Sequence, residues 1–143
     1  MKYKIYLDDV RIPLDEEWVV VRNYDEFVSK INELGLENIK LISLDHDLDA
    51  SAMVEWAKNT YSNYEINYNN ISEKTGLHCA KWLVSEWKVG KPIVDVIVHS
   101  ANAIGSANIM GYINHYLHTM RLPQTCISAQ IAHTDDVNLA SKY

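Results

Sequence analysis

Short apolar runs that are rich in β-branched residues recur along this 143-residue chain. They predict strands at residues 4–7, 18–21, 39–44 and 94–98, and a last strand at 126–132. The run at 39–44 carries apolar residues on both faces and is broken by Lys40 near its start and by Ser43. This pattern is typical of a central parallel strand that is covered by helices.

Three segments between these runs carry apolar residues at helical spacing. N-capping residues and helix-breaking Gly and Pro predict helices within residues 23–35, 75–90 and 105–123. In the first of them, Asn23 and Glu26 have the spacing of a capping box. Strands that alternate with helices predict one α/β domain over residues 1–143, with a mostly parallel sheet and helices on both faces.

Residues 49–74 interrupt this alternation. The segment is crowded with Asn and Tyr and has no strong periodicity, apart from a helical turn or two at 52–58. We interpret it as an insertion after the third strand. Connections of this length in compact domains are often functional lids, or else simply mobile. Its aromatic side chains are candidates for stacking on a base. The polar tail at 133–143 is expected to be flexible.

The formal net charge of −6 argues against a non-specific grip on the backbone of DNA or RNA. Aspartates stand where a signal peptide needs its apolar stretch, and no apolar run approaches the roughly 18 residues that span a bilayer. We therefore expect a cytoplasmic protein without a membrane partner. Cys79 and Cys126 are the only cysteines and are expected to be free and buried.

Three predicted strands end in polar clusters. These clusters are Asp8-Asp9, Asp45-His46-Asp47 and His99-Ser100-Ala101-Asn102. In open parallel sheets, ligands bind beyond the carboxyl ends of the strands. The sequence therefore predicts a functional site where these three clusters converge.

The same residues resemble a receiver domain of the response-regulator type, with acidic residues after its first and third strands. The closer resemblance is to a divergent family, the cyclic-phosphate processing receiver domain. It rests on residues 7–13 (LDDVRIP), 43–48 (SLDHDL), 75–76 (TG), 99–102 (HSAN) and Gly105. The resemblance spans most of the chain.

This resemblance implies a receiver-like (flavodoxin-like) α/β fold, a three-layer sandwich around a mostly parallel sheet. Its first helix would be reduced to a loop at residues 10–17. Residues 126–132 offer no lysine to end the last strand, as a phosphorylation switch requires. The implied function is the processing of a cyclic phosphate on a nucleotide or an RNA end.

His46 and His99 are the candidate general acid and base, because histidine changes protonation near neutral pH. Asp45 and Asp47 complete the candidate catalytic set. The alternative is that each histidine is a hydrogen-bonded structural residue, as we expect for the helical His78, His115 and His118 and for His133 near the tail. Side chains alternate along a strand, so neighbours such as Asp45 and His46 cannot point the same way while the strand stays regular.

Five residues are candidates for holding the phosphate: Arg11, Ser100, Asn102, Gly105 and Ser106. The guanidinium of Arg11 matches phosphate oxygens, although a salt bridge to Asp15 or Glu16 would equally account for it. Asn102, Gly105 and Ser106 precede or open a helix, whose N-terminal N–H groups favour an anion. Simple capping of that helix is the competing explanation. The resemblance to a receiver domain implies that Ser100 is the hydroxyl residue at the end of the fourth strand.

Asp8, Asp9 and Asp45 could hold a hard cation such as Mg²⁺ through oxygen ligands. Alternatively, the aspartates orient the histidines and no cofactor is bound. Two functions from different classes therefore follow. The first is a hydrolase that opens a cyclic phosphate on a small nucleotide or RNA terminus. The second is a non-catalytic receiver-like module that binds a nucleotide or a protein partner, which the sequence does not name.

Overall fold

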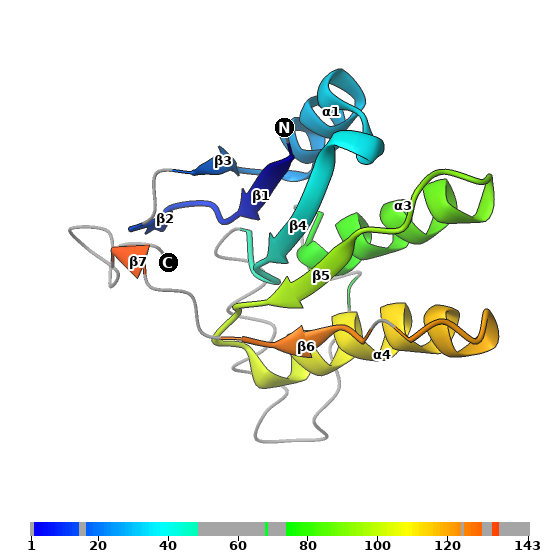
Figure 1. Ribbon diagram of the computed structural model, residues 1–143. Coiled ribbons are helices and arrows are strands. Elements are labelled where there is room, and N and C mark those ends of the chain that lie inside the picture. Colours follow the sequence, from blue (N-terminus) through cyan, green and yellow to red (C-terminus); the bar gives the residue numbers. More distant parts are fainter. Residues whose placement is uncertain are drawn as a thin grey trace.

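Five strands form one parallel sheet in the order β3-β1-β4-β5-β6 in the computed structural model (Figure 1). The strands are β1 (Tyr3–Leu7), β3 (Trp18–Val21), β4 (Ile39–Leu44), β5 (Asp95–Val98) and β6 (Ile127–Ser128). Every neighbouring pair is parallel, as the sequence predicts. The structure describes residues 2–14, 17–48, 68, 74–123, 125–129 and 133–134.

The described helices are α1 (Tyr24–Leu34), the short 3₁₀ helix η1 (Leu36–Asn38), α3 (Gly76–Lys88) and α4 (Ala103–Thr119). The three α-helices begin at polar caps. The side chains of Asn23, Thr75 and Asn102 each accept a hydrogen bond from a backbone N–H of the first turn that follows. These bonds satisfy donors that have no partner within the helix. Helix α4 begins two residues before the predicted Gly105, because Asn102 is the cap.

The three longer helices lie on one face of the sheet. The connections through α1, α3 and α4 all advance in the same direction across the strand order, and right-handed crossovers then place their helices on the same side. Helix α3 packs between α1 and α4 (Figure 1). The step from β1 to β3 runs the opposite way and therefore crosses the other face.

The connection from β1 to β3 contains the two-residue strand β2 (Ile12–Pro13). Among its described residues there is no helix, which agrees with the predicted reduction of the first helix to a loop. In the described part of the chain, helices thus cover one face of the sheet, whereas the sequence predicts them on both. Only ten residues separate Leu7 from Trp18, and those at the start of this connection make a tight turn around Asp8.

The hydrophobic core lies between the sheet and this helical layer. Its fully buried members include Ile5, Leu7, Phe27, Ile31, Ile42, Leu44, Leu83, Ile109 and Ile113. Cys79 and Cys126 are buried and free, as predicted. Burial raises the pKa of the Cys126 thiol to about 12, so it stays protonated.

The C-terminal part shows two differences from the sequence prediction within the described residues. Strand β6 begins at Ile127 rather than at Cys126, because the backbone N–H and C=O of Cys126 bond to the side chain of Asn114 at 2.6 and 2.9 Å. Residues 130–132 of the predicted strand lie outside the described residues. Within the predicted flexible tail, β7 (His133–Thr134) pairs with β2 in an antiparallel ladder. A two-residue strand has too little periodicity to be read from sequence.

The predicted insertion at 49–74 and its helical turns lie outside the described residues, except for Tyr68 and Lys74. In the part of the chain that the structure describes, no helix has the length and apolar character needed to cross a bilayer.

Candidate active site

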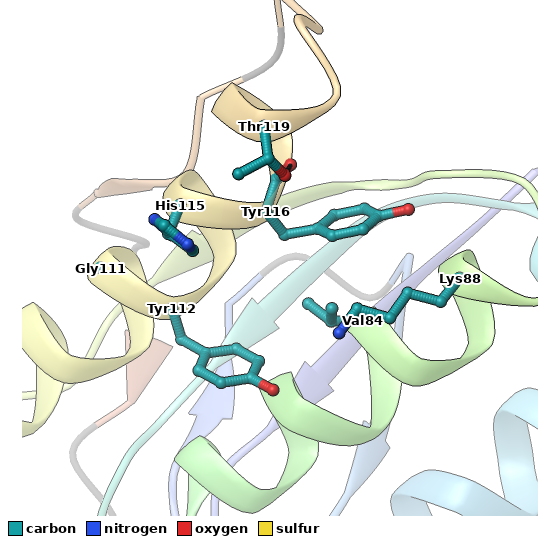
Figure 2. Close-up of a pocket in the computed structure, with 7 residues that line it drawn as sticks. All are labelled: Val84, Lys88, Gly111, Tyr112, His115, Tyr116 and Thr119. Carbon is teal, nitrogen blue, oxygen red and sulfur yellow. Dashed lines mark hydrogen bonds between the residues drawn. The ribbon is translucent and has the colours of Figure 1, made fainter.

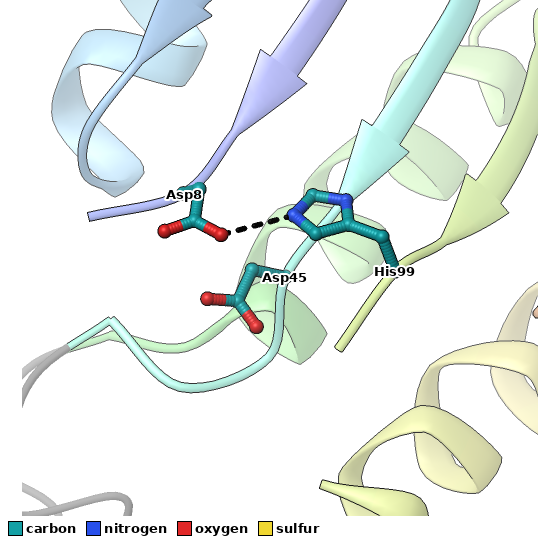
Figure 3. A group of neighbouring side chains, drawn as sticks. All are labelled: Asp8, Asp45 and His99. Carbon is teal, nitrogen blue, oxygen red and sulfur yellow. Dashed lines mark hydrogen bonds and ion pairs between the residues drawn. The ribbon is translucent and has the colours of Figure 1, made fainter. Parts of the chain in front are cut away.

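The three strand ends at which the sequence predicts polar clusters lie side by side at the carboxyl edge of the sheet. Asp8 follows β1, Asp45 follows β4 and His99 follows β5. Backbone hydrogen bonds extend the ladder by one step, from Asp45 N–H to the carbonyl of Leu7 and from His99 N–H to that of Leu44, both at 3.0 Å. One ligand atom from each of Asp8, Asp45 and His99 lies within 4.8 Å of the others (Figure 3).

Asp8 and Arg11 form a buried ion pair. One oxygen of Asp8 accepts the N–H groups of Val10 and Arg11 at 3.0 and 2.9 Å, and the other accepts Arg11 Nε at 2.9 Å. Arg11 Nη2 lies 3.7 Å from Asp45 Oδ1. Burial lowers the pKa of Arg11, but the charges of Asp8 and Asp45 outweigh it and raise that pKa overall.

The salt bridge of Arg11 is therefore made with these two aspartates. Asp15 and Glu16, the partners considered from sequence, lie outside the described residues. A second arginine supports the loop, since Arg22 Nη1 donates to the carbonyls of Asp8 and Arg11 at 3.1 and 2.9 Å. Sequence reasoning missed Arg22, because only the strand pairing brings it to this loop.

His99 belongs to the Asp8 cluster. Its Nε2 lies 3.2 Å from Asp8 Oδ2, and its Nδ1 lies 2.6 Å from the hydroxyl of Ser43. The ring stacks on Tyr6 with centroids 4.3 Å apart. Tyr6 alternates with the core residues of β1 and thus points to the face opposite the helices. Burial and the charge of Asp8 raise the pKa of Tyr6 well above its usual value.

Ser43 and Tyr6 are site residues that the sequence did not identify. They are register partners on β4 and β1, and both are completely buried. The available signal in the sequence is Ser43, a polar residue between the apolar Ile42 and Leu44. Its meaning depends on which residue faces it across the sheet.

His46 belongs to a second network on the helical side. Its Nδ1 lies 2.6 Å from Asp47 Oδ1, and its Nε2 lies 2.8 Å from the hydroxyl of Tyr68. Asn102 Nδ2 donates to the same Asp47 oxygen at 3.0 Å. The ring of His46 is completely buried. Because the Asp47 carboxylate can only accept, His46 Nδ1 carries the hydrogen of this bond.

Two glycines let helices approach this network. A Cβ on Gly105 would lie 2.4 Å from His46 Cγ, and a Cβ on Gly76 would lie 1.9 Å from the carbonyl oxygen of Asp45. The N–H of Gly76 donates to the carbonyl of His46 at 2.9 Å. Close packing therefore accounts for the glycines of the 75–76 and 99–105 blocks.

The N-terminus of α4 is capped by its own residues. Asn102 Oδ1 accepts the N–H of Gly105 at 2.8 Å, and Ser100 Oγ accepts the N–H of Asn102 at 3.1 Å. Ser106 Oγ donates to the carbonyl of Ser100 at 3.4 Å. The capping explanation is thus confirmed, whereas phosphate binding by these residues stays a prediction.

The two candidate histidines enter separate networks. Asp45 and His46 point into different networks, as strand alternation requires, and the His46 N–H bonds to Asp45 Oδ1 at 2.9 Å. Both ring nitrogens of His46 and of His99 already have a partner. A substrate that reacts with either ring must therefore displace a partner or act through it.

The candidate metal ligands differ from those expected. Within the described residues, the group whose ligand atoms converge contains His99 in place of the predicted Asp9. Its carboxylates already face the Arg11 guanidinium, and the Asp8 oxygen close to Arg11 Nε is also the one that faces His99 Nε2. A cation would have to replace these contacts, so the donor set fits an ion only after rearrangement.

Of the remaining described histidines, His78, His115 and His118 lie on helices and His133 lies in β7. His78 accepts the N–H of Thr75 at 2.9 Å and completes a capping box, which confirms its structural role. His115 lines a hollow of about 490 Å³ between α3 and α4, together with Tyr112, Tyr116 and Lys88 (Figure 2). No residue of the candidate active site lines this hollow.

A parallel sheet with an acidic carboxyl edge and helices in its crossovers defines a receiver-like α/β domain. The sequence matches the family model of the cyclic-phosphate processing receiver domain over residues 3–115. The chain belongs to this family. Comparison with curated proteins and with solved structures gave no match.

Proposed function

We propose that this protein hydrolyses a cyclic phosphate on a nucleotide or an RNA end, with His46 as the general base. The observation that carries the proposal is the Asp47–His46 pair, in which a carboxylate holds Nδ1 at 2.6 Å and leaves Nε2 facing a hydroxyl group. A carboxylate at Nδ1 fixes the tautomer of a catalytic imidazole and stabilises the imidazolium that forms. Membership of the cyclic-phosphate processing family supports the substrate class.

In the proposed reaction, a water oxygen forms a bond to phosphorus while its proton passes to His46 Nε2. The ring P–O bond breaks, and the leaving oxygen keeps the bonding pair. It takes a proton from His99 in its imidazolium form, for which Asp8 is the nearby carboxylate. Arg11 balances negative charge at the same edge. The product is a phosphomonoester beside a free hydroxyl group.

Turnover of 2′,3′-cyclic mononucleotides and of a short RNA with a 2′,3′-cyclic phosphate end tests this proposal, with the product followed by ³¹P NMR. Removing a general base typically costs about 10²–10⁴ in rate, so His46→Ala and Asp47→Asn are expected to lower kcat by that range. His118→Ala, an exposed change on α4, is the control and should leave kcat unchanged. Equal rates for all four proteins would contradict the proposal.

One observation favours the second candidate function, a module that binds without catalysis. Both imidazoles are buried, and each nitrogen of both rings already has a protein partner. Imidazole nitrogens that are all hydrogen-bonded within the protein are also typical of a structural network. If calorimetry shows that the protein binds a cyclic nucleotide, and the nucleotide is still intact after days with the protein, the binding module is supported and the hydrolase hypothesis is wrong.

A further inference from the structure

Tyr68 lies against the reactive nitrogen of His46 and is itself held by helix α4. Its hydroxyl is 2.8 Å from His46 Nε2 and accepts a hydrogen bond from Asn108 Nδ2 at 3.0 Å. We propose that Tyr68 is a catalytic residue that relays the proton of the attacking water to His46, and that Asn108 positions it. This inference rests on the proposed function and adds two residues to its machinery.

The hydrogen-bond directions form a single chain. The amide nitrogen of Asn108 can only donate, so the Tyr68 oxygen accepts that bond. Since His46 Nδ1 donates to Asp47, its Nε2 is the acceptor, and the Tyr68 hydroxyl donates to it. The order of donation is therefore Asn108, Tyr68, His46 and Asp47.

The phenol of Tyr68 packs against two imidazole rings. Its ring makes T-shaped contacts with the rings of His46 and His78, at centroid distances of 5.6 and 6.0 Å. Asn108 projects from α4, a regular helix, and therefore offers a fixed anchor. Burial raises the pKa of Tyr68, so the phenol keeps its proton at neutral pH and has one to pass on.

The Tyr68 oxygen has an acceptor lone pair beyond the one that Asn108 uses. A water bound there can lose its proton to the Tyr68 oxygen while the Tyr68 proton moves to His46 Nε2. The water oxygen then bonds to phosphorus, and the ring P–O bond breaks with its electron pair on the leaving oxygen, which His99 protonates. Tyr68 ends the step neutral, and the positive charge rests on His46 beside Asp47.

Tyr68→Phe tests the relay, because it keeps the ring and removes only the hydroxyl. We expect kcat for 2′,3′-cyclic mononucleotides to fall about 100-fold or more with little change in KM, as for loss of an acid–base group. Asn108→Ala should lower kcat about tenfold, the equivalent of one lost hydrogen bond. Tyr112→Phe, an exposed tyrosine on α4 away from the network, is the matched control and should leave kcat unchanged.

A second measurement does not depend on turnover. ¹⁵N NMR of the His46 imidazole should show the Nδ1–H tautomer in the wild-type protein and a mixture of tautomers in Tyr68→Phe, with no such change in Tyr112→Phe. A folded Tyr68→Phe protein with wild-type kcat would overturn the relay, while leaving hydrolysis by His46 intact. If the wild-type protein turns over no cyclic phosphate, the proposed function and the relay both fail, and the NMR result alone shows whether Tyr68 orients His46.

Discussion

At the scale of single residues, His78 links the stability of the protein to pH. Its Nδ1 accepts the N–H of Thr75 at 2.9 Å and lies 3.2 Å from the Thr75 hydroxyl, so the cap of α3 depends on a neutral ring. Burial is the main cause that lowers the pKa of His78 below 6.5, and the nearby Lys81, Lys74 and His46 lower it further. Protonation would place a hydrogen on the accepting nitrogen.

The sign of the pH effect follows from linkage. Between the lowered pKa of the folded protein and 6.5, the unfolded chain binds more protons, so stability rises with pH. The contribution of His78 is thus complete above pH 6.5 and is lost as the pH falls through the lowered pKa. The urea midpoint of unfolding should fall more between pH 7.5 and pH 5.0 in the wild-type protein than in His78→Gln. His118→Gln, a change at an exposed residue, is the control and should show the wild-type drop. A drop of wild-type size in His78→Gln as well would refute the role of His78.

Residues next to strand ends could be identified from sequence, whereas their partners could not. Asp8, Asp45 and His99 follow apolar runs, and the rule that parallel strands end at one edge brings them together. Ser43 and Tyr6 stand inside strands, and Tyr68, Asn108 and Arg22 reach the site through long-range packing. The register and the helix positions that create these contacts are not encoded in local periodicity.

At the scale of elements, the packing of α4 on His46 depends on Gly105. A Cβ there would lie 2.4 to 2.7 Å from three atoms of the imidazole, whereas a Cβ on Gly111 in the same helix meets nothing within 4 Å. Gly105→Ala must therefore push α4 away from the His46 ring. Overpacking of this kind typically costs about 1–3 kcal/mol, while Gly→Ala in an open helix position stabilises by about 0.5–1 kcal/mol.

The matched pair of variants separates packing from helix propensity. We expect chemical denaturation to give a lower free energy of unfolding for Gly105→Ala and a slightly higher one for Gly111→Ala. Gly105→Ala should also perturb the NMR signals of the His46 ring. If both variants gain stability, the contact between Gly105 and His46 does not constrain the helix.

The boundaries of elements were predictable where a cap or a breaker acts locally. Asn23 and Gly35 delimit α1 as expected, and Thr75 begins α3. For α4, the sequence placed the start at a glycine, although that glycine serves packing rather than helix initiation. Strands β2 and β7 were missed because they exist only through their pairing with each other.

At the scale of the whole molecule, the order of strands and helices predicted the parallel sheet. It did not predict that the helices of the described residues all lie on one face of that sheet. Three crossovers advance in one direction and place α1, α3 and α4 on one face. The reversed step from β1 to β3 instead carries Asp8 and Arg11 around a tight turn at the carboxyl edge. The loop between β1 and β3 thus supplies Arg11, the positively charged residue of the site.

The position of Arg11 decides whether we expect a metal ion in this site. The Arg11 guanidinium faces both Asp8 and Asp45, and a divalent ion would have to displace it. His99 Nε2 faces the same Asp8 oxygen that accepts Arg11 Nε, so a metal there would also have to break that contact. Breaking a buried ion pair costs several kcal/mol, which a weakly bound Mg²⁺ does not repay.

We therefore expect the melting temperature of chelator-treated protein to change by less than about 1 °C in millimolar Mg²⁺ or Mn²⁺. An ion present at a concentration of 100 times its Kd would add about 2.7 kcal/mol to the free energy of unfolding by mass action. This would raise the melting temperature by roughly 5–10 °C for a domain of this size. Differential scanning calorimetry distinguishes these outcomes easily. A rise of several degrees that disappears in Asp45→Asn would show that the carboxylates release Arg11 to hold a metal, and that the site works as a cation centre.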